Sequence, residues 1–209
     1  LWSLHKPSLY RVDVVVGADT VSLNTGFRRL EVTPQHLLTL NGKQVPVRGV
    51  NLCHDNAKRG NALTQSDYDA DFATIKSMGA NAIRSVEGPH SQMLYDKCDR
   101  EGMLVWVDTP LCQSPFLSDI AFYASDAFKQ NGREQLKEIV LQNIHHPSVA
   151  MWGIFSLLRG RSTELMDYIK ELNSLAKATD PSRLTVSCSH PDGDINFITD
   201  LIVWQQSVG

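Results

Sequence analysis

Over the first 32 residues, apolar and polar side chains alternate in short runs. Residues 9–16, LYRVDVVV, are rich in valine, and residues 20–32 predict two further short strands that break at Gly26. Two or three strands rarely form a stable domain by themselves. We therefore expect this segment to be the end of a β-sandwich whose earlier strands lie outside the chain.

From about residue 38 the pattern changes to an apolar run, a loop and an amphipathic segment, repeated along the chain. The apolar runs predict six strands, at residues 45–51, 81–86, 103–108, 149–155, 184–189 and 200–204. Apolar positions at helical spacing predict four helices, at residues 65–79, 93–102, 125–144 and 162–180. Gly79 is the expected C-cap of the first helix, and Ser162 is the expected N-cap of the last.

Six strands that each lead into a helix or a loop fit either a doubly wound parallel sheet or a partial (β/α)8 barrel. Periodicity does not choose between the two architectures. No GxGxxG or GxxxxGK[ST] motif follows the first strand, which removes the common nucleotide-binding reason for a doubly wound sheet. We therefore expect an α/β fold of the barrel type.

The charge of the chain argues against two classes of partner. The net charge is -3 and the isoelectric point is about 6.2, so no basic field would attract phosphate backbones or anionic lipid. The sequence has no run of about 18 or more apolar residues, and its start lacks the basic and apolar regions of a signal peptide. We expect neither nucleic acid nor a membrane as a partner, and these features leave the compartment open.

The cysteines are far apart in the sequence and form no CxxC pair, which is not the spacing of a zinc or redox motif. They are Cys53, Cys98, Cys112 and Cys188. We interpret all of them as free thiols, and a buried structural role is the ordinary expectation for each. The sequence predicts no metal and no cofactor.

Five longer motifs follow one another along the chain. They are LWSLHKPSLYRVDVVV, GFRRLEV, LNGKQVPVRGVN, GANAIRSVEGPHSQMLYDKCDREGMLVW and NIHHPSVAMWGIF. Together they resemble glycoside hydrolase family two, the β-galactosidase and β-glucuronidase family. The resemblance implies that residues 1–33 are the last strands of an immunoglobulin-like β-sandwich. It implies that residues 34–209 are the first six βα units of a TIM-type barrel.

The resemblance implies a retaining glycosidase with two glutamates about 5 Å apart, one as acid/base and one as nucleophile. In that family an Asn-Glu pair at the end of the fourth strand supplies the acid/base, whereas this chain has Ser156 and Leu157 there. Leucine cannot transfer a proton. The nucleophile lies on the seventh strand, and this chain stops at about the sixth. We therefore expect a barrel derived from an enzyme that acts on β-linked sugars, but one that is inactive as a glycosidase.

Other departures from the family pattern fall at the carboxyl ends of the same strands, where a barrel builds its active site. The usual Arg-His-Glu-Asp after the first strand is LCHD at residues 52–55, and the His-Tyr-Pro after the second is EGP at residues 87–89. Residues 188–190 and 203–207 depart in the same way. Because the frame keeps the family pattern, this concentration indicates an engineered active site or recruitment to another task.

Two cysteines at strand ends have a histidine nearby in the sequence. Cys188 and His190 are two residues apart, so their side chains share one face of an extended strand, as a thiol nucleophile and its general base would. Cys53 with a histidine from another strand is an alternative. The further partners are Glu87 or Gln205 to orient the imidazole and Ser156 to donate to an oxyanion. This site predicts an esterase-like hydrolase built on the barrel.

Polar and aromatic residues at the strand ends could instead hold a sugar. They are Asp55, Arg84, Asp108, Trp204 and Gln205. A structural ion pair is an equal interpretation for Asp55 and Arg84, and a loop role is as good for Asp108. This set predicts a third function, a non-catalytic sugar-binding module. We expect a carbohydrate or another small molecule as the ligand, and the open edges of a partial barrel favour self-association.

Overall fold

The computed structural model describes residues 1–112, 125–158, 162–190 and 192–206. The first element is an antiparallel hairpin of β1 (Tyr10–Val16) and β2 (Asp19–Thr25), in which all seven residues of each strand are paired. In its turn Gly17 has a φ of +62°, a left-handed conformation that glycine adopts at little cost. The predicted strands are confirmed, and the expected break at Gly26 lies just after β2.

A second antiparallel sheet joins β3 (Leu30–Val32), β4 (Leu38–Leu40) and β5 (Lys43–Gln44). The sequence pattern does not predict β4 or β5. Asn41 and Gly42 form the turn between them with φ of 54° and 77°, the backbone that an Asn-Gly pair favours in a two-residue hairpin. This pair is the sequence signal that locates the hairpin.

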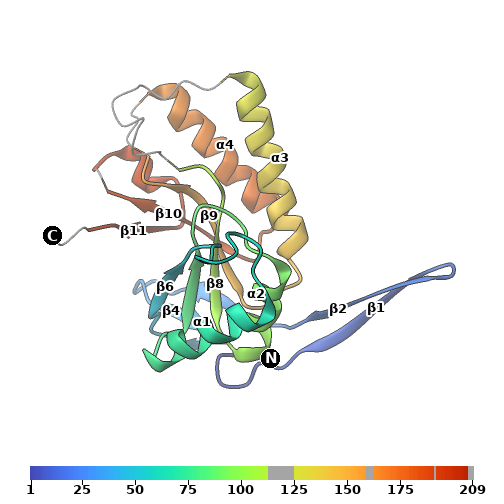
Figure 1. Ribbon diagram of the computed structural model, residues 1–209. Helices are drawn as coiled ribbons and strands as arrows, with labels where there is room; N and C mark the ends of the chain where they lie inside the picture. The colour runs from blue at the N-terminus through green and yellow to red at the C-terminus, as the bar shows by residue number, and fades with distance from the viewer. Residues whose placement is uncertain (113–124, 159–161, 191, 207–209) are drawn as a thin grey trace. The chain divides into compact units, whose positions relative to one another are not determined.

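The main sheet has six strands, and their order in the sheet follows their order in the chain (Figure 1). They are β6 (Gly49–Leu52), β7 (Ala82–Ser85), β8 (Leu104–Asp108), β9 (Val149–Ser156), β10 (Leu184–Ser189) and β11 (Leu201–Trp204). The pairs β6–β7, β9–β10 and β10–β11 are parallel. Every residue of β9 is buried, which is typical of a strand covered on both faces. The six predicted strands and the α/β fold of a partial (β/α)8 barrel are confirmed.

The first of these strands begins later than predicted. The sequence pattern predicts a strand over residues 45–51, whereas β6 begins at Gly49. The Asn81 side chain binds the preceding backbone, because its Oδ1 accepts the Arg48 N–H at 2.8 Å and its Nδ2 donates to the Pro46 carbonyl at 2.7 Å. A side chain therefore satisfies these backbone groups in place of a neighbouring strand.

Four helices connect the strands of the main sheet. They are α1 (Gln65–Ser77), α2 (Gln92–Glu101), α3 (Asp126–Asn143) and α4 (Thr163–Thr179), each within two residues of its predicted ends. The Ser162 hydroxyl accepts the Leu165 N–H at 3.2 Å, which confirms the expected N-cap of α4. A short 3-10 helix, η2 (Asp194–Phe197), precedes β11. Within the described ranges, we find no helix that is both long and apolar enough to cross a membrane.

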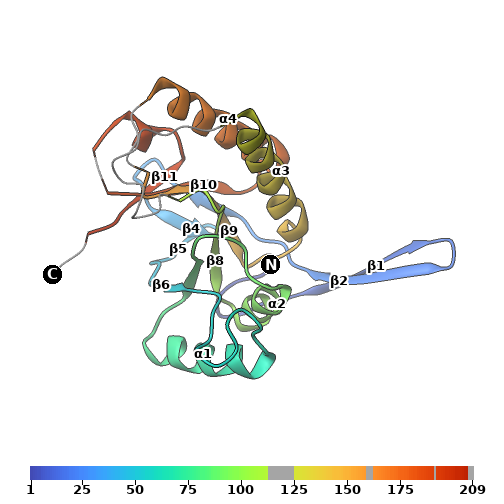
Figure 2. The same ribbon diagram turned by 45° about the horizontal axis from the view of Figure 1, so that its top comes forward.

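The chain divides into two compact units, each with its own core. The first consists of Leu1–Ser85, His90–Val105 and Asn143–Ala150, and the second of Val86–Pro89, Trp106–Gln142 and Met151–Gly209. The first unit contains the hairpin of β1 and β2 and the helices α1 and α2. In the second unit α3 lies beside α4 (Figure 2). The largest buried side chains are Trp2, Tyr68 and Tyr95 in the first unit and Trp152 and Phe155 in the second.

His146 is at the centre of a buried polar network in the first unit. Its Nδ1 lies 2.6 Å from Asp99 Oδ2, and its Nε2 lies 2.8 Å from Gln92 Oε1. The other Asp99 carboxylate oxygen accepts the Ser148 N–H at 2.9 Å, and the Asp99 backbone carbonyl accepts the Trp2 indole N–H at 2.8 Å. Because buried polar groups need hydrogen-bond partners, this network fixes the start of the chain against α2.

Candidate functional site

In the first unit, the loop after β6 and the strand β7 carry three of the predicted site residues. Cys53 and Asp55 are exposed in the loop, whereas Arg84 is buried within β7. β6 and β7 pair in parallel from Gly49 to Leu52, so the loop after β6 leaves the sheet at the same edge as the loop after β7. Of the two candidate nucleophiles, Cys53 is the more accessible because it is exposed, whereas Cys188 is buried.

His90, which no sequence motif marks as a site residue, lies in this unit. The rings of His54 and His90 have centroids 4.8 Å apart and planes inclined by 40°. Burial, followed by the nearby His54, lowers the pKa of His90 to about 4. The His90 backbone N–H donates to the Tyr95 hydroxyl at 2.8 Å, and burial raises the pKa of Tyr95 to about 12. His90 lies just before Ser91, the N-cap of α2, but no sequence pattern indicates that it meets His54.

In the second unit, Asp108 ends β8 and is buried. Its Oδ2 accepts the Glu87 backbone N–H at 3.3 Å, while the Glu87 side chain is exposed and its backbone has a φ of 62°. A Cβ built on Gly153 of β9 would meet Asp108 Oδ1 and lie 2.9 Å from the Asp108 Cα. Thr109 donates from its Oγ1 to the Ile154 carbonyl at 2.8 Å. Asp108 is thus packed tightly against β9, which supports the structural interpretation.

β9 ends at Ser156, and Leu157 follows it. Ser156 is buried and its N–H donates to the Leu111 carbonyl at 3.0 Å. Leu157 has a φ of 57°, and its N–H donates to the Cys188 carbonyl at 2.8 Å. A leucine in this left-handed region is uncommon and costs about 1–2 kcal/mol. The backbone at this strand end is therefore held in a strained conformation by its neighbour β10.

Cys188 and His190 have different surroundings in the second unit. Cys188 is 2% exposed, and its Sγ lies 3.7 Å from Gln205 Oε1. The thiol is therefore a donor to the amide oxygen and has little access to a substrate from solvent. β10 ends at Ser189, so the alternation on which a shared face depends stops before the exposed His190. The predicted partner Gln205 does lie beside Cys188. It directly follows β11, and its backbone N–H donates to the Ser189 carbonyl at 2.8 Å.

Trp204, the predicted sugar-stacking residue, is 48% exposed at the end of β11. It lines a cavity of about 530 Å³ in the second unit. The other lining residues are Asp192, Gly193, Asp194, Asn196, Phe197, Thr199, Asp200 and Ile202. Two aromatic side chains and three carboxylates thus line one cavity. One of these carboxylates, Asp200, already accepts the Thr185 N–H at 2.9 Å.

A group of three ligating side chains occurs in the first unit. Asp96, Asp99 and His146 present atoms within 4.8 Å of one another. Both carboxylate oxygens of Asp99 and both ring nitrogens of His146 already contact protein groups in the buried network. We therefore interpret this group as part of the core and not as a metal centre.

Comparison with known proteins identifies the family. Residues 30–207 match the TIM barrel domain of glycosyl hydrolases family 2. A β-glucuronidase of Bacteroides fragilis is 36% identical over 215 residues, which cover all of this chain and 31% of that protein. A putative β-glucuronidase of Formosa agariphila is 31% identical, with 92% of this chain and 24% of that protein covered. The chain thus spans about a third or less of these relatives.

Solved structures agree with the sequence match. An FMN-binding β-glucuronidase from Faecalibacterium prausnitzii has a TM-score of 0.89 at 35% identity, covering 99% of this chain and 33% of that chain. A β-galacturonidase from Eisenbergiella tayi, bound to galacturonate, has a TM-score of 0.88 at 27% identity, covering 98% of this chain and 36% of that chain. The motifs, the strand order and these likenesses agree: the chain belongs to glycosyl hydrolase family 2 and carries its TIM-barrel domain over residues 30–207.

Proposed function

We propose that this chain is the barrel region of a family-two protein that takes up a β-linked sugar but does not hydrolyse it by the family's general acid. The names of its relatives, β-glucuronidases and β-galactosidases, supply the sugar class. The observation that carries the proposal is Leu157, which follows β9 where the resemblance places the acid/base glutamate.

Leu157 leaves the departing sugar oxygen without a proton donor. Loss of such a donor commonly costs about 10²- to 10⁴-fold in rate. Glu87 and Asp108 are the carboxylates at the two preceding strand ends, and neither occupies the position after β9. Asp108 is buried and accepts a backbone N–H, and Glu87 is exposed on a loop. Neither is therefore a ready substitute for the missing glutamate.

The cavity beside β11 supports sugar uptake without catalysis. Trp204 and Phe197 are 48% and 86% exposed, so both offer faces for the apolar side of a pyranose ring. Asp192 and Asp194 line the same hollow and supply acceptors for sugar hydroxyls. Aromatic faces with a few polar groups are typical of small-ligand sites.

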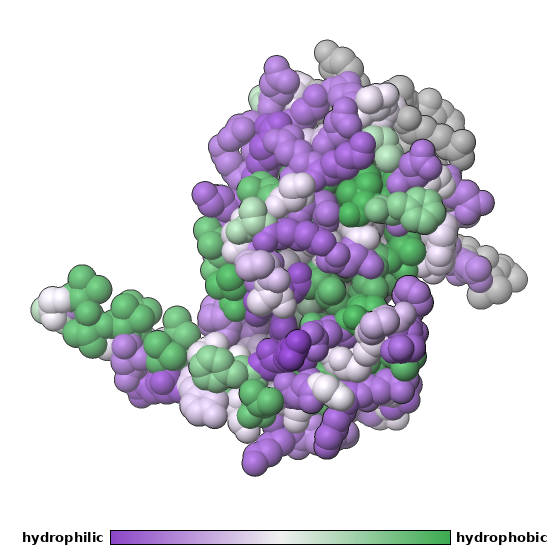
Figure 3. All heavy atoms as spheres, turned by 180° about the vertical axis from the view of Figure 1, so that it is seen from behind, coloured by the Kyte–Doolittle hydropathy of each residue, from purple (hydrophilic) through white to green (hydrophobic). Residues whose placement is uncertain are grey.

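We also propose that residues 1–33 are the last strands of an immunoglobulin-like β-sandwich and that residues 34–209 are the first six βα units of the barrel. Apolar side chains gather on the hairpin of β1 and β2 (Figure 3). They include Val14, Val15, Val16 and Val21, which are 48% to 72% exposed. Val14, Val16 and Val21 share one face of the hairpin, which a facing sheet would bury, as in a sandwich.

Recruitment or redesign of the barrel for binding explains why the family pattern changes at strand ends and not in the frame. The experiment uses the longest natural protein that contains this chain, together with its Trp204→Ala variant. We expect the natural protein to bind a β-glucuronide or β-galactoside disaccharide by calorimetry and to leave it uncleaved. We expect Trp204→Ala to weaken that binding. Robust disaccharide cleavage by the natural protein would overturn the proposal.

A thiol hydrolase is a second candidate, and one observation favours the Cys53 version. Cys53 is exposed in the loop after β6 and is followed by His54, whereas Cys188 is buried beside an amide oxygen. An esterase-like reaction would acylate Cys53. Mass spectrometry after treatment with an activated ester decides between this candidate and the sugar-binding barrel.

A further inference from the structure

The paired histidines of the first unit come from the ends of neighbouring parallel strands. His54 lies two residues after β6, and His90 lies in the connection between β7 and α2. Leu52 and Ser85 form the last pair of these two strands, so both connections start at one edge of the sheet. Their ring centroids are 4.8 Å apart and their planes are inclined by 40°, so the two imidazoles lie side by side.

His90 is 7% exposed, and neither of its ring nitrogens makes a hydrogen bond of ordinary geometry to the described residues; a weaker contact with the Leu52 backbone acts to raise its pKa. A buried polar group without a partner costs about 1–3 kcal/mol, and such groups usually find a protein, water or ion partner. The Tyr95 hydroxyl holds the His90 backbone N–H at 2.8 Å and leaves the ring to interact elsewhere. The ring of His90 therefore has a nitrogen that can bind a ligand.

The separation of the two rings fits ligation of one ion. A zinc–nitrogen bond is about 2.0–2.1 Å and a ring nitrogen lies about 1.2 Å from its ring centre, so two imidazoles bound at about 90–110° have centroids about 4.5–5.2 Å apart. The observed 4.8 Å lies within this range. His54 is half-buried, so an ion could reach the pair from its side.

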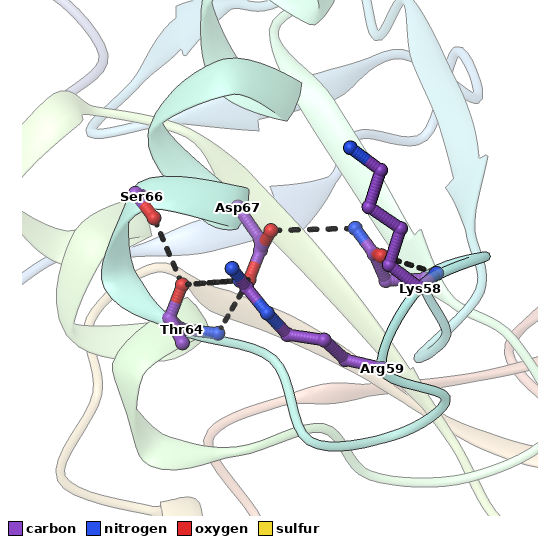
Figure 4. A network of polar contacts seen from close by, with 6 residues as sticks. Lys58, Arg59, Thr64, Ser66 and Asp67 are labelled. Atoms are coloured by element: carbon purple, nitrogen blue, oxygen red, sulfur yellow. Dashed lines mark hydrogen bonds and ion pairs between the residues drawn. The ribbon is translucent and has the colours of Figure 1, made fainter.

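The loop that carries His54 is fixed by a polar network at the start of α1 (Figure 4). Asp67 is its centre: its Oδ2 accepts from Arg59 at 2.7 Å and from the Thr64 N–H at 2.8 Å, and its Oδ1 accepts from Asn56 at 3.3 Å. Asn56 is only two residues from His54. A side chain whose loop is already fixed loses less conformational freedom when it binds an ion.

The flanking residues do not extend the pair. Cys53 and Asp55 are exposed on either side of the half-buried His54, and in the described part of the chain neither contacts the His90 ring, so the site consists of the two histidines. Two imidazole ligands with the remaining positions open suit zinc, nickel or copper(II), and not magnesium or calcium, which prefer oxygen ligands.

We propose that His54 and His90 form a binding site for one borderline divalent ion, Zn²⁺, Ni²⁺ or Cu²⁺. Two protein nitrogens hold the ion, and water or oxygen atoms of a small ligand complete its coordination. The site is separate from the Asp99 and His146 network, whose ligand atoms are already used within the protein. It does not depend on sugar binding or on the nature of residue 157.

Calorimetric titration with ZnCl₂ tests the site, and His5→Gln is the matched control because His5 is exposed. We expect one equivalent of Zn²⁺ to bind the unmodified protein and the control alike. We expect His54→Gln and His90→Gln each to weaken binding at least tenfold, and MgCl₂ to give no heat. His54→Gln decides the matter if the buried His90→Gln variant fails to fold.

A second measurement identifies the ligands directly. The electron paramagnetic resonance spectrum of the Cu²⁺-loaded protein is expected to show superhyperfine splitting from two nitrogens, reduced to one in His54→Gln. Absence of Zn²⁺ binding in the unmodified protein, or equal affinity in His54→Gln, would overturn the proposal.

Discussion

The backbone N–H of Leu157 donates to the Cys188 carbonyl at 2.8 Å while Leu157 has a φ of 57°. The end of β10 thus holds the residue after β9 in a conformation that favours glycine. The backbone of residue 157, the position that the proposed function compares with the family's acid/base, is thus fixed by a contact that does not depend on its side chain.

The protein is expected to be more stable with glycine at position 157 than with alanine. Both Leu157→Gly and Leu157→Ala remove the leucine side chain, but only alanine keeps a Cβ in the left-handed region. We expect Leu157→Gly to have a free energy of unfolding about 1 kcal/mol higher than Leu157→Ala, measured by urea denaturation. Equal stability of the two variants would show that the backbone is not held at positive φ.

Gly102 is expected to tolerate alanine less well than Gly79 does. Both glycines follow helices and have φ of 68° and 73°, so alanine strains both backbones. A Cβ on Gly102 would also collide with the Leu4 carbonyl oxygen, whereas a Cβ on Gly79 would meet open space. We expect Gly79→Ala to cost about 1 kcal/mol and Gly102→Ala clearly more, by thermal or urea unfolding. A cost for Gly102→Ala no larger than that of its control would argue against this close approach.

Asp180 is expected to make folding sensitive to acid. Burial would raise its pKa, but the Arg183 guanidinium 2.7 Å away, Ser182 and the Trp152 indole outweigh burial and lower it. A carboxyl with a lowered pKa in the folded state stabilises the protein above its unfolded pKa of about 3.9, and this stability is lost as pH falls through the folded value.

The variant Asp180→Asn removes the carboxylate that pairs with the buried Arg183. We expect a loss of about 3–5 kcal/mol at pH 7 and a flatter decline of stability below about pH 4, both followed by urea unfolding at several pH values. The exposed Lys170–Asp167 pair supplies the control, since Asp167→Asn should change stability by less than about 1 kcal/mol. An unchanged acid profile in Asp180→Asn would contradict the assignment.

Cys53 is expected to react first with a limiting dose of iodoacetamide near neutral pH. Cys98 and Cys188 are buried, and burial raises the pKa of Cys98 further, so both should be slow. Peptide mass spectrometry gives the order of labelling. An acyl adduct on Cys53 from an activated ester would support the thiol hydrolase, and its absence would leave the sugar-binding barrel as the better account.

Periodicity and caps predicted the elements that depend on local sequence. The helix at 162–180 has Ser162 as its cap, and the six strands occur in the predicted order. The start of β6 was misplaced because the Asn81 side chain, distant in sequence, satisfies the backbone before Gly49.

The candidate site was harder to predict because its geometry is tertiary. Alternation placed Cys188 and His190 on one face, but β10 ends between them. The approach of His54 to His90 joins loops from two strands and leaves no mark in either segment alone. Leu157 at positive φ has no sequence signal either, since leucine is not typical of that conformation.

The tight contact of Gly153 with Asp108 has a consequence for how this barrel can evolve. Substitutions within β9 must pass through a crowded core, where even one methyl group meets Asp108. Leu157 lies just outside that strand and is half-buried, so its side chain can change with little effect on the strand itself. The side chain at position 157 can therefore change in the course of evolution without unfolding the barrel, whereas side chains within β9 have little freedom to do so.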